Sequence, residues 1–341
     1  MTFLKEIKQQ PSALAELLRR YNEDKETASR FKDKLKTQNI SRFIFTGMGS
    51  SNFVGYIASV LLSKKGIIAG AYEANEFACT GLNTVGKDTL VFLISQSGSS
   101  EETLELCDKI NPENLSVITN NPNGPLYQYG TAKFLLYAGD EHTTATKTYT
   151  NTIASVLFIC NLILECKGLE PYDFSTEINK CINIMQHLID ENSNAMTEFF
   201  ADAAYICLVG GLASYCTVSH SQLVVEEAGK MYCTRYLPAQ FLHGPLELIH
   251  KNFSVIAFDS SEGTRAAVDR IIDNVLAYGG KICVIGNREI KITSERLMCI
   301  KHDMENEFYA PLIEVIPVEL FINDIGMKRG LNPGILTRVR K

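Results

Sequence analysis

Short apolar runs alternate along the chain with segments of helical spacing. Leu90–Ile94 is apolar throughout, which is typical of a strand buried in a parallel sheet. Polar residues 95–100 follow, and apolar positions then recur at helical spacing over 104–110. Phe43–Thr46 begins a second strand, loop and helix of the same kind. We therefore expect a parallel sheet flanked by helices, with further short strands at 115–119 and 134–137.

Helical patterns lie on either side of these strands. Apolar residues between 14 and 21 share one face and predict a packing helix that starts near Pro11. A long apolar helix is predicted from Ile153 to Leu164. The interval 168–175 combines Gly, Pro, Asp and Ser, which predicts a linker between two domains.

The second half of the chain repeats the pattern of the first. Residues 205–214 parallel 43–51, and residues 255–264 parallel 92–100 at nearly the same offset. Matching offsets at two strand ends argue for duplicated domains. We expect a packing region at 1–38, domains at 39–168 and 176–330, and a tail near the active site at 331–341.

The two copies differ in their chemistry. Asp259 stands where the first copy has Ser95. A carboxylate at that position would repel a phosphate. We therefore expect one ligand site per chain, in the first half.

Composition narrows the class of protein. At 341 residues the chain can form two domains, each with its own core. The net charge of −6 is spread out, so no nucleic-acid partner is expected, and no apolar run approaches the ~20 residues of a membrane span. The ten cysteines lack a C-x-x-C pair and the N-terminus lacks a secretion signal, so we expect a cytoplasmic protein. The six histidines show no compact ligand spacing, so no metal is expected.

The first polar loop carries candidate chemistry. Ser95, Gln96, Ser97 and Ser100 offer hydroxyl and amide groups at the predicted start of a helix, where backbone N–H groups bind anions. This chemistry suits a phosphate, although a serine-rich N-cap and turn is an alternative interpretation. The hydroxyl-rich run 143–150 has the same two interpretations, as a helix cap or as part of the ligand site.

A nucleotide site is disfavoured. G-M-G at 47–49 follows a predicted strand, but the third glycine of the dinucleotide fingerprint is missing.

Several motifs together resemble the SIS (sugar isomerase) family. They are S-Q-S-G-S-S at 95–100, G-M-G-S-S at 47–51, Thr146-Lys147, and the segment 226–245 with its H-G-P end. The chain is similar from about residue 30 onward to the isomerase half of glucosamine-6-phosphate synthase and to its stand-alone relatives. The resemblance implies an α/β fold of two doubly wound parallel-sheet domains in tandem, each of three layers.

The resemblance also implies roles for single residues. Glu227 falls at the family's proton-transferring carboxylate, and His243 falls at the histidine that assists sugar ring opening. Without the resemblance they would be taken as a solvated helix residue and a turn residue. In the family this histidine reaches the neighbouring subunit's active site, which implies a homodimer, and no cofactor is required. The implied phosphate and substrate contacts are Gly49, Ser51, Ser95, Gln96, Ser97, Ser100, Thr146 and Arg338.

Departures from the synthases narrow the expected activity. Val224 stands where they carry a lysine, and Arg338 stands at a second lysine. Arginine keeps its proton and cannot form a Schiff base. The chain also begins directly with the packing helix, so we do not expect glutamine-dependent synthesis by this chain alone.

The remaining activities all act on a sugar 6-phosphate. They are aldose–ketose isomerisation, deamination, and deglycation of a fructosamine 6-phosphate. A sensor that binds a phosphosugar without turning it over is the alternative from another class. The presence of both Glu227 and His243 favours an enzyme.

Overall fold

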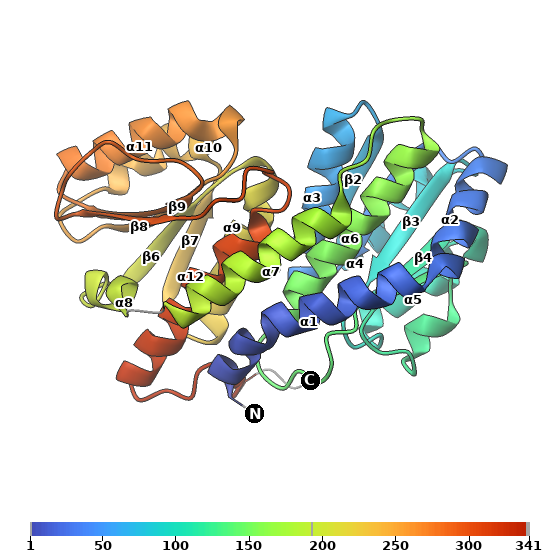
Figure 1. Cartoon of the computed structure of the whole chain (residues 1–341), viewed down its shortest axis with the longest axis horizontal. Helices are drawn as coiled ribbons and strands as arrows, with labels where there is room; N and C mark the ends of the chain where they lie inside the picture. Colours follow the sequence, from blue (N-terminus) through green and yellow to red (C-terminus); the bar gives the residue numbers. More distant parts are fainter. Residues whose placement is uncertain (1, 192–193, 339–341) are drawn as a thin grey trace. The chain divides into compact units, whose positions relative to one another are not determined.

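The computed structural model describes residues 2–191 and 194–338, and the chain forms two compact units (Figure 1). Both units are discontinuous in sequence. The N-terminal unit comprises 12–140 and 147–179, and the C-terminal unit comprises 1–11, 141–146 and 180–341. Helices α1 (Phe3–Glu23) and α7 (Phe174–Asp190) each contribute residues to both units.

The N-terminal unit is built on a five-stranded parallel sheet in the order β2-β1-β3-β4-β5. All six residues of β3 are buried, which explains why its sequence is apolar without interruption. Gly47 at the end of β1 pairs with Ile94 at the end of β3, so these two strands end side by side. The strands are β1 (Arg42–Gly47), β2 (Ile68–Glu73), β3 (Thr89–Ile94), β4 (Leu115–Thr119) and β5 (Ala132–Leu135).

Helices cover both faces of this sheet. Ile44 and Val91 pack against Phe77 of α4 on one face. On the other face Phe45 stacks on Phe92 at a centroid distance of 4.6 Å, and Phe92 meets Phe31 of α2. The helices are α2 (Lys25–Thr37), α3 (Ser50–Lys64), α4 (Ala74–Thr80), α5 (Glu101–Lys109) and α6 (Lys147–Cys166), with 3₁₀ turns at Leu82–Thr84, Pro112–Asn114 and Pro125–Gln128.

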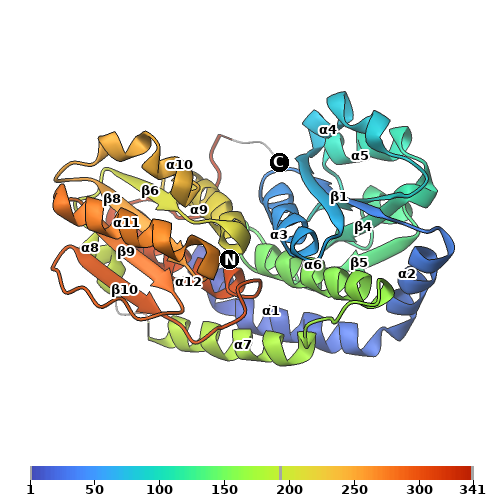
Figure 2. The ribbon, with the colours of Figure 1, turned by 90° about the horizontal axis from the view of Figure 1, so that it is seen from above.

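Helix α6 is the longest apolar element of the N-terminal unit. Its length and composition alone would allow it to cross a membrane, contrary to the expectation that no run approaches that length. However, 83% of its most apolar window is buried inside the structure, where it packs beside α3 (Figure 2). Burial on nearly all sides explains its composition as that of a core helix.

The C-terminal unit repeats this architecture. Its five parallel strands lie in the order β10-β9-β8-β6-β7. Read from β7, each strand takes the same place in the order as its counterpart in the N-terminal sheet, as expected for a duplicated fold. The strands are β6 (Tyr205–Val209), β7 (Tyr232–Tyr236), β8 (Ser254–Asp259), β9 (Lys281–Gly286) and β10 (Leu297–Lys301).

The helices of this unit also form two layers. Val255 and Val284 of the sheet pack against Phe241 of α10 and Ile271 of α11. Helices α9 and α12 pack against each other in the other layer. The helices are α8 (Ala195–Phe199), α9 (Tyr215–Glu227), α10 (Pro238–Leu242), α11 (Arg265–Ala277) and α12 (Pro311–Lys328), with 3₁₀ turns at Leu212–Ser214, Pro245–Leu248 and Glu262–Thr264.

The fold class predicted from the sequence is confirmed, with local differences. Pro11 lies inside α1 and does not start it, because the buried side chains of Phe3 and Ile7 extend the apolar face by two further turns. Strand β5 ends at Leu135, whereas 134–137 was expected. The strands that the sequence analysis did not predict are β2, β7, β9 and β10.

Three of these four strands lie at sheet edges. Strands β2, β7 and β10 are exposed along one side. Such strands carry polar residues among the apolar ones, so they lack the continuous apolar run of a central parallel strand. The expected domain limits, 39–168 and 176–330, stay a prediction. The compact units are discontinuous in sequence and divide the chain at other positions.

Candidate functional site

The strand order of the N-terminal unit marks a place for a ligand. The direction of winding reverses between β1 and β3, whose carboxyl ends lie side by side. In open α/β sheets, ligands bind at this topological switch point. Helix α3 starts after β1 and helix α5 starts after β3, so both helix N-termini lie at the same edge of the sheet.

The loop after β3 leaves its helix N-terminus without a side-chain cap. Ser100 is the N-cap residue of α5, yet its side chain makes no capping hydrogen bond. Its hydroxyl lies 2.9 Å from the hydroxyl of Ser95, which is almost fully buried. The first-turn N–H groups therefore have no partner in the side chain of the N-cap residue, which suits an anion.

The carbonyl groups of this loop are bonded to the next loop of the sheet. Asn120 N–H donates to the Gln96 carbonyl at 3.1 Å, and the Asn121 side chain donates to the Ser97 carbonyl at 3.0 Å. Gly98 has a φ of +67° and would place a Cβ 3.0 Å from the Thr119 hydroxyl. Carbonyl oxygens repel anions, so these hydrogen bonds reduce the negative potential that the loop would present to an anionic ligand.

Ser97 also has a local structural role. Its hydroxyl accepts hydrogen bonds from the amide of Ser99 at 3.2 Å and from the Ser99 hydroxyl at 3.0 Å. This is the serine turn of the alternative interpretation. In the hydrogen bond between the two hydroxyls, Ser99 is the donor and Ser97 the acceptor. The proton of the Ser97 hydroxyl can therefore be donated to another group.

Two further predicted residues lie at the same sheet edge. Gly49 is the N-cap of α3 with a φ of +52°, and Ser51 follows in the first turn, half-buried. The Ser51 amide donates to the Met48 carbonyl at 3.1 Å. The structure therefore brings Gly49 and Ser51 to the switch point together with the loop at 95–100.

Glu227 lies in the C-terminal unit as the last residue of α9. It is half-buried, and its Oε2 accepts a hydrogen bond from the hydroxyl of Thr144. Lys230, three residues on, donates from Nζ to the Glu227 carbonyl at 2.6 Å and to the Ile335 carbonyl at 3.4 Å. The carboxylate thus has one oxygen fixed by a buried hydroxyl, in a region where the C-terminal segment returns to α9.

Glu227 opens onto a large cavity of the same unit. The cavity measures about 910 Å³ and is lined by α9, β7 and the segment 331–338. Arg338 and Lys230 supply cationic groups, and Glu226 supplies a second carboxylate. Its apolar wall consists of Leu223, Met231, Leu331, Ile335 and Leu336.

Two predicted residues lie elsewhere in the C-terminal unit. His243 ends α10, is exposed, and is not among the described residues that line the Glu227 cavity. Thr146 is fully buried, and its amide and hydroxyl bond the Glu141 carboxylate at 3.0 and 3.1 Å. Within the C-terminal unit, therefore, the structure brings together Glu227 and Arg338 but not His243.

The equivalent switch point of the C-terminal unit holds carboxylates of the chain itself. Asp259, at the end of β8, is paired with Arg288 at 2.5 Å, so its charge is compensated and is not the free anion that the sequence analysis expected. Glu314 of α12 instead accepts the hydroxyl groups of Ser214 at 3.0 Å and Ser260 at 2.5 Å. The Glu314 carboxylate thus accepts hydrogen bonds from two hydroxyl groups at the place that corresponds to the serine loop of the N-terminal unit.

Burial shifts the pKa values of Glu314 and of the neighbouring His302. Desolvation raises the pKa of Glu314 to about 7, against the lowering effect of the Ser260 and Ser214 hydroxyls. Desolvation also lowers the pKa of His302, whose ring lies 3.2 Å from the Ser260 hydroxyl, to about 4. Nothing in the sequence pattern pointed to Glu314, which lies 54 residues from Ser260.

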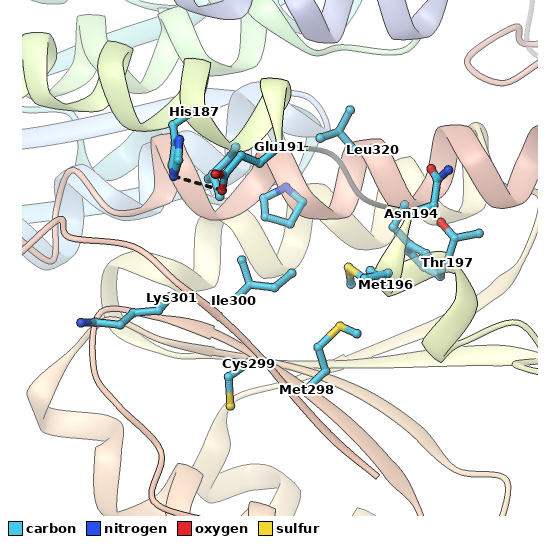
Figure 3. Close-up of a pocket in the computed structure, with 14 residues that line it drawn as sticks. His187, Glu191, Asn194, Met196, Thr197, Met298, Cys299, Ile300, Lys301 and Leu320 are labelled. Carbon is cyan, nitrogen blue, oxygen red and sulfur yellow. Dashed lines mark ion pairs between the residues drawn. The ribbon is translucent and has the colours of Figure 1, made fainter. Parts of the chain in front are cut away.

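A second cavity of the C-terminal unit contains none of the predicted residues. It measures about 350 Å³ and lies between α7, α8, β10 and α12. Figure 3 shows Met196, Met298 and Leu320 around it, with the His187–Glu191 ion pair of 3.1 Å at its rim. Within 2–191 and 194–338, no group of three or more His, Cys, Asp or Glu side chains is arranged to hold a metal ion.

A family model matches the part of the chain that contains the serine loop. The model is that of the SIS domain, and it matches residues 36–162, which is less than half of the chain. Over 338 residues the chain is 24% identical to a glutamine–fructose-6-phosphate aminotransferase (isomerizing) of Geobacillus kaustophilus. That match covers 96% of this chain and 55% of the relative, so the chain spans about half the length of the relative.

Solved structures share the fold of nearly the whole chain. The C-terminal domain of glucosamine-fructose-6-phosphate aminotransferase from Francisella tularensis superposes with a TM-score of 0.86 at 22% identity, covering 98% of both chains. Tagatose-6-phosphate ketose/aldose isomerase from Escherichia coli superposes with a TM-score of 0.82 at 19% identity, covering 100% of this chain and 97% of the other. At these identities the likeness establishes the fold, which includes both units.

Proposed function

We propose that the protein binds a sugar 6-phosphate and moves a proton between C1 and C2 of its ring-opened form, with Glu227 as the base. The observation that carries this proposal is the environment of the Glu227 carboxylate. It is a half-buried carboxylate that faces a large cavity, with one oxygen held by Thr144. A carboxylate with one oxygen fixed in place is suited to take a proton from a bound substrate and to return it.

The proton balance of the reaction is simple. Glu227 takes a proton from C1 of the ketose while the carbonyl oxygen at C2 gains one, which gives an enediol. Glu227 then returns its proton to C2 while the hydroxyl at C1 loses its own, which gives the aldose. One C–H bond breaks and one forms, so no redox group is needed.

The serine loop supplies remote binding energy. Ser95, Gln96, Ser97 and Ser100, with Ser51, would hold the phosphate at the switch point of the N-terminal unit. Binding energy from a group that does not react can be used to hold C1 and C2 in position. We assign Gly49 a supporting part in this phosphate site, and we propose the buried Thr146 as a substrate contact of the C-terminal unit.

The Glu227 cavity favours a substrate with a substituent on the sugar. Its volume of about 910 Å³ and its wall of five aliphatic side chains exceed what a small polar sugar would fill. Arg338 keeps its charge and would bind an anionic group there. An N-substituted fructosamine 6-phosphate fits this description better than an unsubstituted ketose.

The same proton transfer would release the amine. Moving a proton from C1 to C2 of a fructosamine gives an imine at C1. Water then cleaves the imine to an aldose phosphate and the free amine. Isomerisation and deglycation therefore share the role of Glu227 and differ only in the atom attached to C1.

We assign His243 to ring opening in a homodimer. It is exposed at the end of α10 and does not line the cavity of Glu227 in the described part of its unit. A histidine in that position is available to a second subunit, and its imidazole can donate or accept a proton. None of the ten cysteines forms a disulfide, which suits the reducing cytoplasm in which we propose that the protein acts.

Hydrogen exchange in heavy water tests the proposal without knowledge of the natural substrate. Purified protein is incubated with a panel of fructose, glucosamine and fructosamine 6-phosphates, and exchange at C1 and C2 is followed by NMR. We expect exchange with wild type and a decrease of about 10²–10⁴-fold in Glu227→Gln, with ligand affinity nearly unchanged. Equal exchange in both proteins would remove Glu227 from the mechanism, whereas binding without exchange across the panel would favour a phosphosugar sensor.

A further inference from the structure

A buried carboxylate near the N-terminus holds the segment that contacts Glu227. Glu6 of α1 is fully buried. Its carboxylate accepts the amide of His142 at 2.7 Å, the amide of Thr143 at 3.1 Å and the hydroxyl of Thr143. Burying a carboxylate costs free energy unless donors compensate it. All three of these donors belong to residues 142 and 143, so Glu6 and this segment depend on each other.

The next residue along the segment makes the contact with Glu227. Thr144 is also buried, and its hydroxyl donates to Oε2 of Glu227. Its amide donates to the Gly334 carbonyl at 2.9 Å. The position of Thr144 is therefore set on one side by the bonds of its neighbours to Glu6 and on the other by the C-terminal segment.

The C-terminal segment fits closely against the same residues. A Cβ on Gly334 would lie 2.8 Å from Cβ of Thr143 and 3.0 Å from Cβ of Phe3, and its φ is +78°. Residues 142–144 are thus packed between the start of α1 and residue 334.

We propose that Glu6 is a positioning residue for Glu227, acting through the backbone and hydroxyl of Thr143 and the hydroxyl of Thr144. The inference rests on the proposed function, in which Glu227 carries the proton. Thr144 holds Oε2, which leaves Oε1 as the carboxylate oxygen without a side-chain or backbone donor among residues 2–191 and 194–338. Glu6 thereby determines which oxygen of the base faces the substrate, although it lies far from Glu227 in sequence.

Two variants of Thr144 separate the effect of its hydroxyl group from the effect of its side-chain size. Thr144→Val keeps the size of the side chain and removes the donor, whereas Thr144→Ser keeps the donor. Glu6→Gln keeps the shape but turns an NH₂ group toward backbone N–H donors. Gln10→Met is the matched control, because Gln10 is buried on the same helix and bonds Glu319 of α12 at 2.5 Å, away from Thr144.

Steady-state kinetics and C1/C2 hydrogen exchange are measured for each folded variant. We expect kcat and the exchange rate to fall about tenfold in Thr144→Val and in Glu6→Gln, with KM changed by less than about twofold. Thr144→Ser and Gln10→Met should stay within about threefold of wild type. In the double variant of Glu6→Gln and Thr144→Val, kcat and the exchange rate should lie within about twofold of those of Thr144→Val alone. Both changes act on Oε2 of Glu227, so their effects should not multiply.

The outcomes separate this inference from the proposed function. If wild type exchanges hydrogen and Thr144→Val does so at the same rate, the positioning role is wrong while Glu227 keeps its role. If Gln10→Met slows exchange as much as Glu6→Gln, or the double variant shows the product of both losses, the effect is a general loosening and the positioning role is again overturned. If wild type exchanges no hydrogen with any phosphosugar, both proposals fail.

Discussion

At the scale of single residues, the serine loop combines two roles that look alike in sequence. Ser97 closes a turn with Ser99, and Ser100 bonds Ser95 rather than capping its own helix. The first arrangement is the structural interpretation of the loop, and the second leaves a helix N-terminus open for an anion. The structure therefore shows the serine turn at Ser97, while the phosphate site stays a prediction.

Ser97→Asp tests the phosphate loop. We expect it to abolish binding of a sugar 6-phosphate, because a carboxylate would face the like charge of the phosphate. Calorimetry with fructose 6-phosphate measures the binding, and circular dichroism confirms the fold. Asn179→Asp is the control, since it adds the same charge at an exposed position of α7 in the same unit. Undiminished binding by folded Ser97→Asp would place the phosphate elsewhere.

Gly98→Ala tests the conformation of the same loop. The φ of +67° is unfavourable for alanine, and the added Cβ would lie 3.0 Å from the Thr119 hydroxyl. We expect a loss of about 1–2 kcal/mol in the free energy of unfolding, measured by urea titration, together with weaker phosphosugar binding. Gly66→Ala is the comparison, because its φ is +76° but no atom lies within 4 Å of the added Cβ. A similar loss in both variants would attribute the cost to φ alone.

At the scale of elements, helix α12 supplies the feature that most distinguishes the two units. It carries Glu314 to the end of β8, where the carboxylate accepts the hydroxyls of Ser214 and Ser260. A buried carboxylate that bonds these hydroxyls competes with any external anion. The prediction of one ligand site per chain therefore has a physical basis other than Asp259, which is paired with Arg288.

Glu314→Gln tests how the free energy of unfolding depends on pH, and the direction of the change is defined. Burial raises the pKa of Glu314 to about 7 from 4.5, so the folded state binds the proton more tightly than the unfolded state. Its contribution to stability is complete below about pH 4.5 and is lost as pH rises through about 7, by about 3 kcal/mol in all. The difference in unfolding free energy between wild type and Glu314→Gln should fall over this range in urea titrations.

The groups that face Glu314 do not change this sign. Desolvation lowers the pKa of His302 to about 4, so its own contribution is lost as pH falls, in the opposite direction. Because His302 and Asp259 are present in both proteins, their contributions largely cancel in the difference. A difference that is flat between pH 4.5 and 7 would show that Glu314 titrates normally.

At the scale of the whole molecule, the duplication is visible in strand order rather than in chemistry. Both sheets use the same order of their five strands, yet the N-terminal unit has an open serine loop and the C-terminal unit has Glu227 and its cavity. Residues 1–11 and 141–146 come from the first half of the chain but belong to the C-terminal unit.

Mixing two inactive variants tests whether subunits share an active site. Glu227→Gln and His243→Ala chains are each expected to be inactive. If the two residues of one site come from different chains, a mixed dimer has one intact site, so activity should partly return on subunit exchange. Mass spectrometry confirms the mixed dimer. Continued inactivity would argue that both residues act within one chain or that His243 has no catalytic role.

The sequence by itself determined the central strands except β9, together with the repeat and the serine loop. Strands β3 and β4 are buried on both faces, and burial on both faces leaves a continuous apolar run in the sequence. Edge strands such as β2 and β7 lack that run, because one of their sides is exposed. The loop at 95–100 was recognisable because its chemistry is contained in consecutive residues.

Only the tertiary structure decided which side chains act on the carboxylates. Thr144 bonds Glu227 across 83 residues, Thr143 bonds Glu6 across 137, and Ser214 bonds Glu314 across 100. The hydrophobic pattern records which face of an element is buried, but it does not record which polar groups meet once the elements pack. Buried carboxylates require donors from whatever segment packs against them, so their partners are determined by topology and not by spacing along the chain.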